Sequence, residues 1–151
     1  MSEKILVSAC LAGYPCRYDG KAQTDSSIVE LLRSGIAVPV CPECMGGLPT
    51  PRLPAEIVGG SGEDVLFGTA KVVASDKCDH VTDVTASFIK GAEAALAAAK
   101  ENLASKAILK ANSPSCGCGT IYDGTFSGTR KHGNGVTAAM LLANGISVES
   151  I

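Results

Sequence analysis

The chain has 151 residues, of which 46% are hydrophobic, and a formal net charge of −2. This length is enough for a single domain with a real core and too short for two domains. The slightly acidic balance argues against a nucleic-acid-binding protein with a strongly basic face. Aromatic residues make up only 4% of the chain and Trp is absent, which argues against recognition of bases by stacking.

The first residues, Met-Ser-Glu-Lys, lead straight into a short apolar run that lacks the length of a signal-peptide core. No apolar run approaches the roughly 18 residues of a membrane span. We therefore expect a cytoplasmic protein that does not enter a membrane. In a reducing compartment thiols bind metals or react more often than they form structural disulfides. This bears on the seven cysteines, at positions 10, 16, 41, 44, 78, 116 and 118.

Strands and helices alternate along the predicted chain. Apolar runs without polar alternation predict buried strands at 5–9, 36–40, 106–110 and 146–149. Apolar residues at helical spacing predict helices at 24–35, 82–103 and 136–142. Thr24 or Asp25 is expected to cap the first helix, which Gly35 ends, and Asn134 to cap the last. Pro39 removes a backbone donor, which predicts that its strand lies at a sheet edge.

Two further segments fit no strong periodicity. Residues 42–62 are punctuated by proline and glycine, and this pattern predicts a long functional loop. Residues 64–74 predict a small accessory hairpin that turns near Gly68. The order of elements predicts an α/β fold in three layers: a mostly parallel sheet, with strand order 2-1-3-4, covered by helices on both faces.

Three of the cysteines follow the carboxyl ends of separate predicted strands. Cys10 ends the first, Cys41 the second, and Cys116 lies in the glycine-rich stretch after the third. Ligands of open parallel sheets bind beyond the carboxyl ends of the strands, so these thiols are expected to converge on one site. Each of the other thiols in these loops neighbours a better-placed one and could be an extra ligand, a resolving thiol or a bystander: Cys16, Cys44 and Cys118. Cys78 precedes the long helix and is interpreted as structural.

These thiols are compatible with several chemistries. Cys41-x-x-Cys44 is the spacing of a thioredoxin-like redox pair, which needs a helix N-terminus behind the first thiol, and the Gly-Gly-Leu-Pro-Thr-Pro sequence that follows predicts none. Zinc held by 41/44 with 116/118 would require an unfavourable one-residue spacing. Many soft thiolates favour iron–sulfur or zinc, and three ligands would leave one cluster iron open as a Lewis acid. Glu43, between two thiols, is either a general base or a solvated loop carboxylate.

Charged residues near the strand ends are candidates for binding a substrate: Arg17, Asp19 and Lys110. Asp19 could instead hold Arg17 or stabilise the tight turn before Gly20. Lys110 and Arg52 are also placed to offset the negative charge of a thiolate-bound cluster.

Three blocks of the sequence resemble the thiouracil desulfidase family, long catalogued as a bacterial domain of unknown function. The first is Val-Ser-Ala-Cys-Leu-Ala-Gly at 7–13 with Cys-Arg-Tyr-Asp-Gly at 16–20. The second is Cys-Pro-Glu at 41–43 with Gly-Gly-Leu-Pro-Thr-Pro-Arg at 46–52, and the third is Leu-Lys at 109–110 with Ser-Pro-Ser-Cys-Gly at 113–117. The resemblance implies a [4Fe-4S] cluster held by three cysteines and hydrolytic removal of sulfur from thiolated uracil compounds.

Carried over to this chain, the resemblance implies ligation of the cluster by Cys10, Cys41 and Cys116. It implies acid–base work by Glu43, and orientation of substrate or water by Ser113 or Ser115. Cys44 and Cys118 depart from the pattern that we associate with this family, which leaves the second ligand open between Cys41 and Cys44.

We therefore predict an iron–sulfur-dependent, non-redox desulfidase that acts on a small thiolated pyrimidine, such as thiouracil or a thiouridine, rather than on nucleic acid. The alternative is a non-catalytic zinc-binding or thiol redox module, which after aerobic preparation would hold zinc or no metal. A third hypothesis, a phosphate-ligand binding protein, is the weakest because no G-x-x-x-x-G-K-[ST] motif follows a strand.

Overall fold

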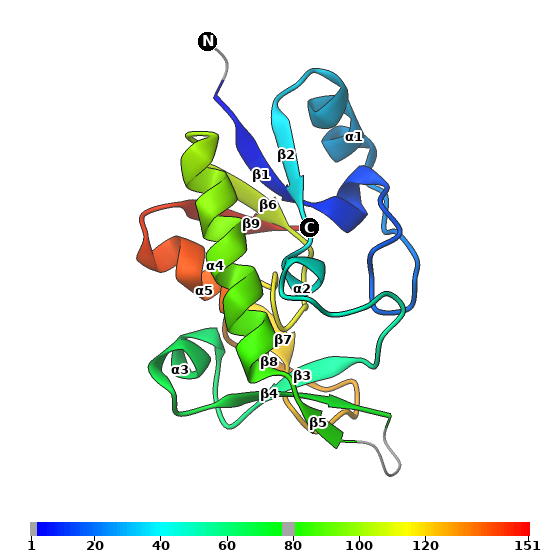
Figure 1. The fold of residues 1–151 in the computed structure, drawn as a ribbon, viewed down its shortest axis with the longest axis vertical. Helices are drawn as coiled ribbons and strands as arrows, with labels where there is room; N and C mark the ends of the chain where they lie inside the picture. Colours follow the sequence, from blue (N-terminus) through cyan, green and yellow to red (C-terminus); the bar gives the residue numbers. More distant parts are fainter. Residues whose placement is uncertain (1–2, 77–80) are drawn as a thin grey trace.

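A parallel sheet lies at the centre of the computed structural model, which describes residues 3–76 and 81–151 (Figure 1). Within the described residues its strands follow the order β2-β1-β6-β9, and every pair is parallel. Their bounds are β1 Ile5–Ser8, β2 Ala37–Val40, β6 Lys106–Leu109 and β9 Ser147–Ser150. The predicted order 2-1-3-4 is confirmed, and β2, which contains Pro39, lies at the predicted sheet edge.

Helices cover both faces of this sheet, as predicted. The alternation of side chains along β1 explains why: Leu6 and Val7 are both fully buried, yet they belong to hydrophobic clusters on opposite faces. Leu6 packs in the cluster shared with α4 (Thr85–Glu101) and α5 (Val136–Ala143). Val7 packs in the cluster that includes Ile28 of α1 (Ser26–Arg33). The sheet is therefore the middle of three layers.

The ends of the helices test the predicted caps. Asp25 caps α1, because its Oδ1 accepts hydrogen bonds from the N–H groups of Ser27 at 2.9 Å and Ile28 at 3.3 Å. The prediction for the last helix was wrong by one residue. Gly135 is the N-cap of α5, while Asn134 Oδ1 accepts from the Gly119 N–H at 2.8 Å. A side chain at position 135 would meet the backbone of residue 115 at 2.5 Å, so this close approach requires glycine.

An antiparallel sheet is formed by β3 (Ala55–Val58), β4 (Lys71–Ser75) and β5 (Val81–Asp83), and it lies below the parallel sheet in the view of Figure 1. The hairpin predicted at 64–74 was wrong in its bounds: β4 pairs with β3, and α3 (Gly62–Phe67) stands between them. The sequence contains a signal for α3 that was overlooked, a capping box in which the Ser61 N–H donates to Asp64 Oδ2 at 2.8 Å. Gly68, at φ 96°, ends α3 rather than turning a hairpin.

The predicted loops contain short elements. The stretch at 42–62 was predicted to be a loop, but it begins with a one-turn helix, α2 (Pro42–Met45). The glycine-rich stretch after β6 contains the hairpin of β7 (Thr120–Tyr122) and β8 (Arg130–His132). A 3-10 turn, η1 (Ala9–Ala12), follows β1. Cys78, which we interpreted as structural, lies outside the described residues. None of the helices in residues 3–76 and 81–151 is both long and apolar enough to span a bilayer.

Candidate active site

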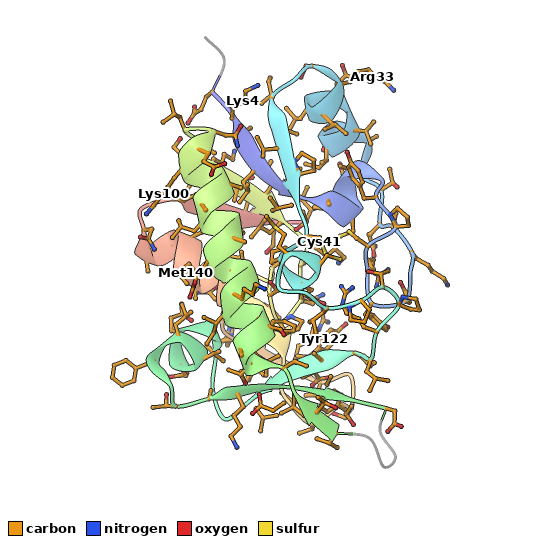
Figure 2. All side chains as sticks on the ribbon, in the orientation of Figure 1. Lys4, Arg33, Cys41, Lys100, Tyr122 and Met140 are labelled. Carbon is orange, nitrogen blue, oxygen red and sulfur yellow. The ribbon has the colours of Figure 1, made fainter. Side chains whose placement is uncertain are left out.

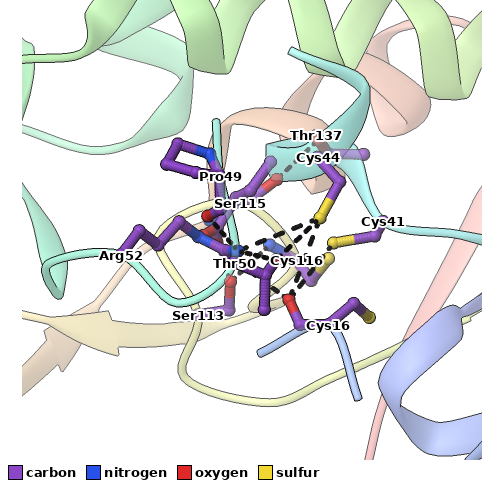
Figure 3. A network of polar contacts seen from close by, with 11 residues as sticks. Cys16, Cys41, Cys44, Pro49, Thr50, Arg52, Ser113, Ser115, Cys116 and Thr137 are labelled. Atoms are coloured by element: carbon purple, nitrogen blue, oxygen red, sulfur yellow. Dashed lines mark hydrogen bonds and ion pairs between the residues drawn. The ribbon is translucent and has the colours of Figure 1, made fainter. Parts of the chain in front are cut away.

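A cavity of about 360 Å³ opens beyond the carboxyl ends of β1, β2 and β6. Cys10 reaches it from η1, Cys41 from the residue directly after β2, and Cys116 from the loop after β6. The structure therefore brings together the three thiols that were expected to converge. Figure 3 shows Cys41 and Cys116 with their sulfur atoms turned toward the same region, beside Cys16.

The environment of these thiols opposes ionisation. Burial, followed by the neighbouring Cys41, raises the pKa of Cys10, and burial raises the pKa of Cys116 to about 12. A hydrogen bond between the thiols of Cys41 and Cys16 raises the pKa of Cys41, which burial raises further, and lowers the pKa of Cys16. Burial and mutual repulsion thus oppose ionisation of Cys10, Cys41 and Cys116, whereas Cys16 ionises more readily, and a cationic ligand would stabilise the first three as thiolates.

Glu43 and Arg52 form an almost buried ion pair on the cavity wall. Arg52 Nε lies 2.7 Å from Glu43 Oε2, and the two side chains are 8% and 16% exposed respectively. The guanidinium also donates to the carbonyl of Cys16 at 3.0 Å and to Thr50 Oγ1 at 3.0 Å (Figure 3). Arg52 therefore ties the Glu43 carboxylate to the loop that carries Cys16. Fixed in this way, Glu43 presents a carboxylate to the cavity in a defined position.

The helix α2 places both a thiol and this carboxylate. Cys41 is its N-cap and Glu43 lies in its first turn. The prediction that no helix follows Cys41 was wrong, although α2 is a single turn. Its position depends on Gly91 of α4, where a Cβ atom would lie 1.9 Å from the Pro42 carbonyl oxygen. The backbones of α2 and α4 can touch only because no side chain intervenes.

The two candidate serines have different surroundings. Ser113 lines the cavity, and its Oγ accepts hydrogen bonds from the N–H groups of Ser115 and Cys116, each at 3.1 Å. Ser115 is 1% exposed, does not line the cavity, and pairs with Thr137 Oγ1 at 2.8 Å (Figure 3). Ser113 is therefore the serine whose hydroxyl can reach a ligand, and Ser115 anchors the loop to α5.

The candidate charged residues differ in whether they line the cavity. Arg17 and Lys110 line the cavity, and both charges act to lower the pKa of Cys10 against the dominant effect of burial. Asp19 does not line the cavity. It lies 3.9 Å from Arg17 and accepts the N–H of Lys21 at 3.0 Å, the arrangement of a turn-stabilising residue. Arg17 and Lys110 remain placed to offset negative charge in the cavity.

The additional thiols also differ in whether they line the cavity. Cys16 lines the cavity, whereas Cys44 and Cys118 do not. Cys44 Sγ lies 3.4 Å from Thr50 Oγ1. Cys118 Sγ donates to the Val148 carbonyl at 3.7 Å and packs beside the core under α4 and α5.

The arrangement of the thiols distinguishes a zinc ion from an iron–sulfur cluster. Within the described residues no three His, Cys, Asp or Glu groups lie close enough to hold a single metal ion, so a tetrahedral zinc site is not preformed there. A [4Fe-4S] cluster distributes its thiolate ligands around a larger body. Three thiols delivered from separate strand ends to one cavity fit that requirement.

Sequence reasoning missed other residues of the cavity wall. Arg52 was expected to offset the charge of a thiolate-bound cluster, but its ion pair with Glu43 was not predicted, since nothing in the sequence shows that it reaches back nine positions. Glu56, Tyr122 and Phe126 also line the cavity; Glu56 lies on β3, within residues that were predicted to be loop, and no role was predicted for any of the three. Glu56 and Ile57 are adjacent and both buried on β3, so this strand shows no apolar and polar alternation that could have marked Glu56 in the sequence.

Together, the fold and the cavity define an α/β protein with a cysteine-lined site at the carboxyl edge of its parallel sheet. The family model described as 2-thiouracil desulfurase matches residues 5–150, and the chain belongs to this family. It is 53% identical over 146 residues to "Uncharacterized protein YbbK" of Bacillus subtilis (strain 168), covering 97% of this chain and 94% of that protein. It is 44% identical to the solved structure of the [4Fe-4S]-dependent thiouracil desulfidase TudS, with a TM-score of 0.84 and coverage of 99% of this chain and 91% of that one. The resemblance and the predicted fold class are confirmed.

Proposed function

We propose that this protein is a [4Fe-4S]-dependent desulfidase that hydrolyses the thiocarbonyl group of a small thiolated pyrimidine such as 2-thiouracil. The observation that carries the proposal is the convergence of Cys10, Cys41 and Cys116 on one cavity that also holds Glu43. Membership of the family and the similarity to TudS support the reaction and the cofactor. A cavity of about 360 Å³ has the size of a small-molecule site.

In this proposal Cys10, Cys41 and Cys116 hold the cluster. When bound, the cluster supplies an iron without a protein ligand, which acts as a Lewis acid toward sulfur. Arg17 and Lys110 offset the negative charge of the thiolates, because both line the same cavity. Cys41 is the second ligand rather than Cys44, since Cys44 does not line the cavity.

The protein groups carry the proton transfers. Water adds to the thiocarbonyl carbon, Glu43 accepts a proton from it, and Ser113 orients the water or the ring. The carbon–sulfur bond then breaks as Glu43 returns this first proton to the departing sulfur. The added hydroxyl loses its second proton as the carbonyl forms, and the sulfide with both protons leaves as hydrogen sulfide. No electrons are exchanged. Arg52 holds the Glu43 carboxylate in place through the 2.7 Å contact.

The cellular setting follows from the same chemistry. A site of several free thiols suits a reducing compartment, so we propose that the protein works in the cytoplasm. Its net charge of −2 favours a small-molecule partner over nucleic acid.

Anaerobic purification and reconstitution test the proposal. We expect iron and sulfide to be incorporated, a brown colour, and conversion of 2-thiouracil to uracil with release of sulfide. Cys116→Ala should lose iron and sulfide, while Cys118→Ala, two residues further along the loop and outside the cavity, should retain both. A colourless protein that cannot be reconstituted, or one that binds zinc with these thiols, would favour the non-catalytic alternative.

Variants at Glu43 and at the second thiol separate ligation from catalysis. Glu43→Gln should keep the cluster and lower kcat by about 100- to 10,000-fold, the usual contribution of a general acid–base. Cys41→Ala should lose the cluster, and Cys44→Ala should keep it. Normal turnover by Glu43→Gln would remove the assigned role of this carboxylate.

A further inference from the structure

The few aromatic residues of the chain gather at the candidate site. The low aromatic content argues against recognition by stacking, but of the six aromatic residues in the sequence three line the cavity: Tyr18, Tyr122 and Phe126. Tyr122, on β7, lies below α2 in the view of Figure 2. Although aromatic residues are scarce in the sequence, the fold places half of them around the cavity.

Phe126 is not explained by packing. It is partly buried, yet it belongs to none of the hydrophobic clusters found among the described residues. Its backbone is left-handed, at φ 56°, a conformation that is unfavourable for a residue with a bulky side chain. Strained positions of this kind persist when the surroundings enforce them and are found at binding and catalytic sites.

The buried carboxylate of Glu56 enforces this conformation. Glu56 is 8% exposed, and its Oε1 accepts hydrogen bonds from the N–H groups of Gly124 at 2.9 Å and Phe126 at 3.2 Å. Within the described residues it has no ion-pair partner. Gly124 is at φ 93°, and a Cβ atom there would lie 2.6 Å from the carbonyl oxygen of Ile57. The loop between β7 and β8 is therefore fixed against β3 by the Glu56 carboxylate and by a close backbone approach at Gly124, and both hold Phe126 at the cavity wall.

We propose that Phe126 is a specificity-determining residue that stacks on the planar ring of the substrate, and that Glu56 is the positioning residue that holds it there. This inference rests on the proposed function. A thiolated pyrimidine presents a flat π face, and a fixed phenyl ring recognises such a face without hydrogen bonds. The ring, rather than the sulfur alone, then contributes to substrate selection. Thiocarbonyl compounds without an aromatic ring gain nothing from this contact.

The test compares the cluster-loaded wild-type protein with Phe126→Leu and Phe126→Tyr. Leucine keeps an apolar side chain but removes the π face, while tyrosine restores it. Phe126→Leu should raise KM for 2-thiouracil and the Kd of uracil, measured by calorimetry, by about 5- to 100-fold. Phe126→Tyr should return both constants to near the wild-type values. Phe67→Leu, at an 85% exposed residue of α3, is the matched control and should change neither.

Variants of Glu56 separate positioning from general stability. Glu56→Gln keeps an acceptor oxygen and should retain the wild-type KM, whereas Glu56→Ala should raise KM as Phe126→Leu does. The KM of the double variant Glu56→Ala/Phe126→Leu should be no higher than that of either single variant, because both changes remove the same contact between Phe126 and the substrate ring. Additive losses would assign Glu56 a separate role and overturn its part in the proposal.

The outcomes distinguish this inference from the proposed function. Wild-type turnover with an unchanged KM and uracil Kd in Phe126→Leu overturns the stacking role and leaves the desulfidase proposal intact. A cluster-loaded wild-type protein that binds uracil but does not desulfurate 2-thiouracil overturns the proposed activity, and the Kd values then still decide the stacking role. A wild-type protein that does neither overturns both.

Discussion

Replacement of Arg52 by Gln tests the buried ion pair at the centre of the site. The change leaves the Glu43 carboxylate, only 16% exposed, without its counter-charge, and it removes the donor to the Cys16 carbonyl. Breaking one partner of a buried pair costs about 3–5 kcal/mol, and we expect a fall in the free energy of unfolding near the lower end, ~3 kcal/mol, because the pair retains some exposure. With a urea m-value of about 1–3 kcal/mol/M, the midpoint should fall by about 1–3 M.

Neutralising the partner should recover part of this loss. In Arg52→Gln/Glu43→Gln no uncompensated charge remains, so the double variant should unfold at a higher urea concentration than Arg52→Gln alone. Arg33→Gln is the control, because Arg33 and Glu30 are 74% and 71% exposed and form a pair of 3.6 Å that should not shift the midpoint measurably. The reasoning is refuted if Arg52→Gln behaves like Arg33→Gln, or if the double variant is the least stable of the three.

Three further variants test contacts that stabilise α4, α5 and α1. Gly91→Ala, although alanine is the better helix former, should lower both the urea midpoint and cluster content, because its methyl group would lie 1.9 Å from the Pro42 oxygen. Ser115→Ala leaves the buried Thr137 hydroxyl unpaired, and urea denaturation should show a loss of about 1–3 kcal/mol. Hydrogen bonds at the start of α1 lower the pKa of Asp25, so its stabilisation is complete above the unfolded pKa of about 3.9 and is lost as pH falls through the lower folded value. Stability measured against pH should therefore lose this acid-range dependence in Asp25→Asn.

The sheet and its thiols could be predicted because the signals are local and the geometry of parallel strands is general. Buried strands such as β1 and β6 are continuous apolar runs, and the helices between them have a clear period. Pro39 marked the edge strand correctly. Once the strand ends were known, the convergence of Cys10 and Cys116 followed from topology without any contact being seen.

The elements that were not predicted from the sequence are short or depend on contacts with residues that are distant along the chain. The four residues of α2 are too few to show a helical period, and the three-residue strands β7 and β8 too few to show alternation. Side-chain roles were harder still. Ser113 and Ser115 have the same chemistry two residues apart, and only the position of Thr137 on α5 decides which of them faces the cavity. Arg52 likewise acquires its role from the fold of the 46–52 segment.

The contact between α2 and α4 explains how two kinds of chemistry share one site. Cys41 and Glu43 lie on the same turn, so a displacement of α2 moves a proposed cluster ligand and the proposed acid–base group together. Gly91 fixes that turn against α4, and a Cβ atom on Gly46 would lie 2.0 Å from the Ser87 carbonyl, so the contact is tight at both ends. Arg52 then sets the carboxylate from the opposite side. The backbone positions of Cys41 and Glu43 are therefore set by the packing of α2 against α4, and the carboxylate end of the Glu43 side chain is fixed by Arg52.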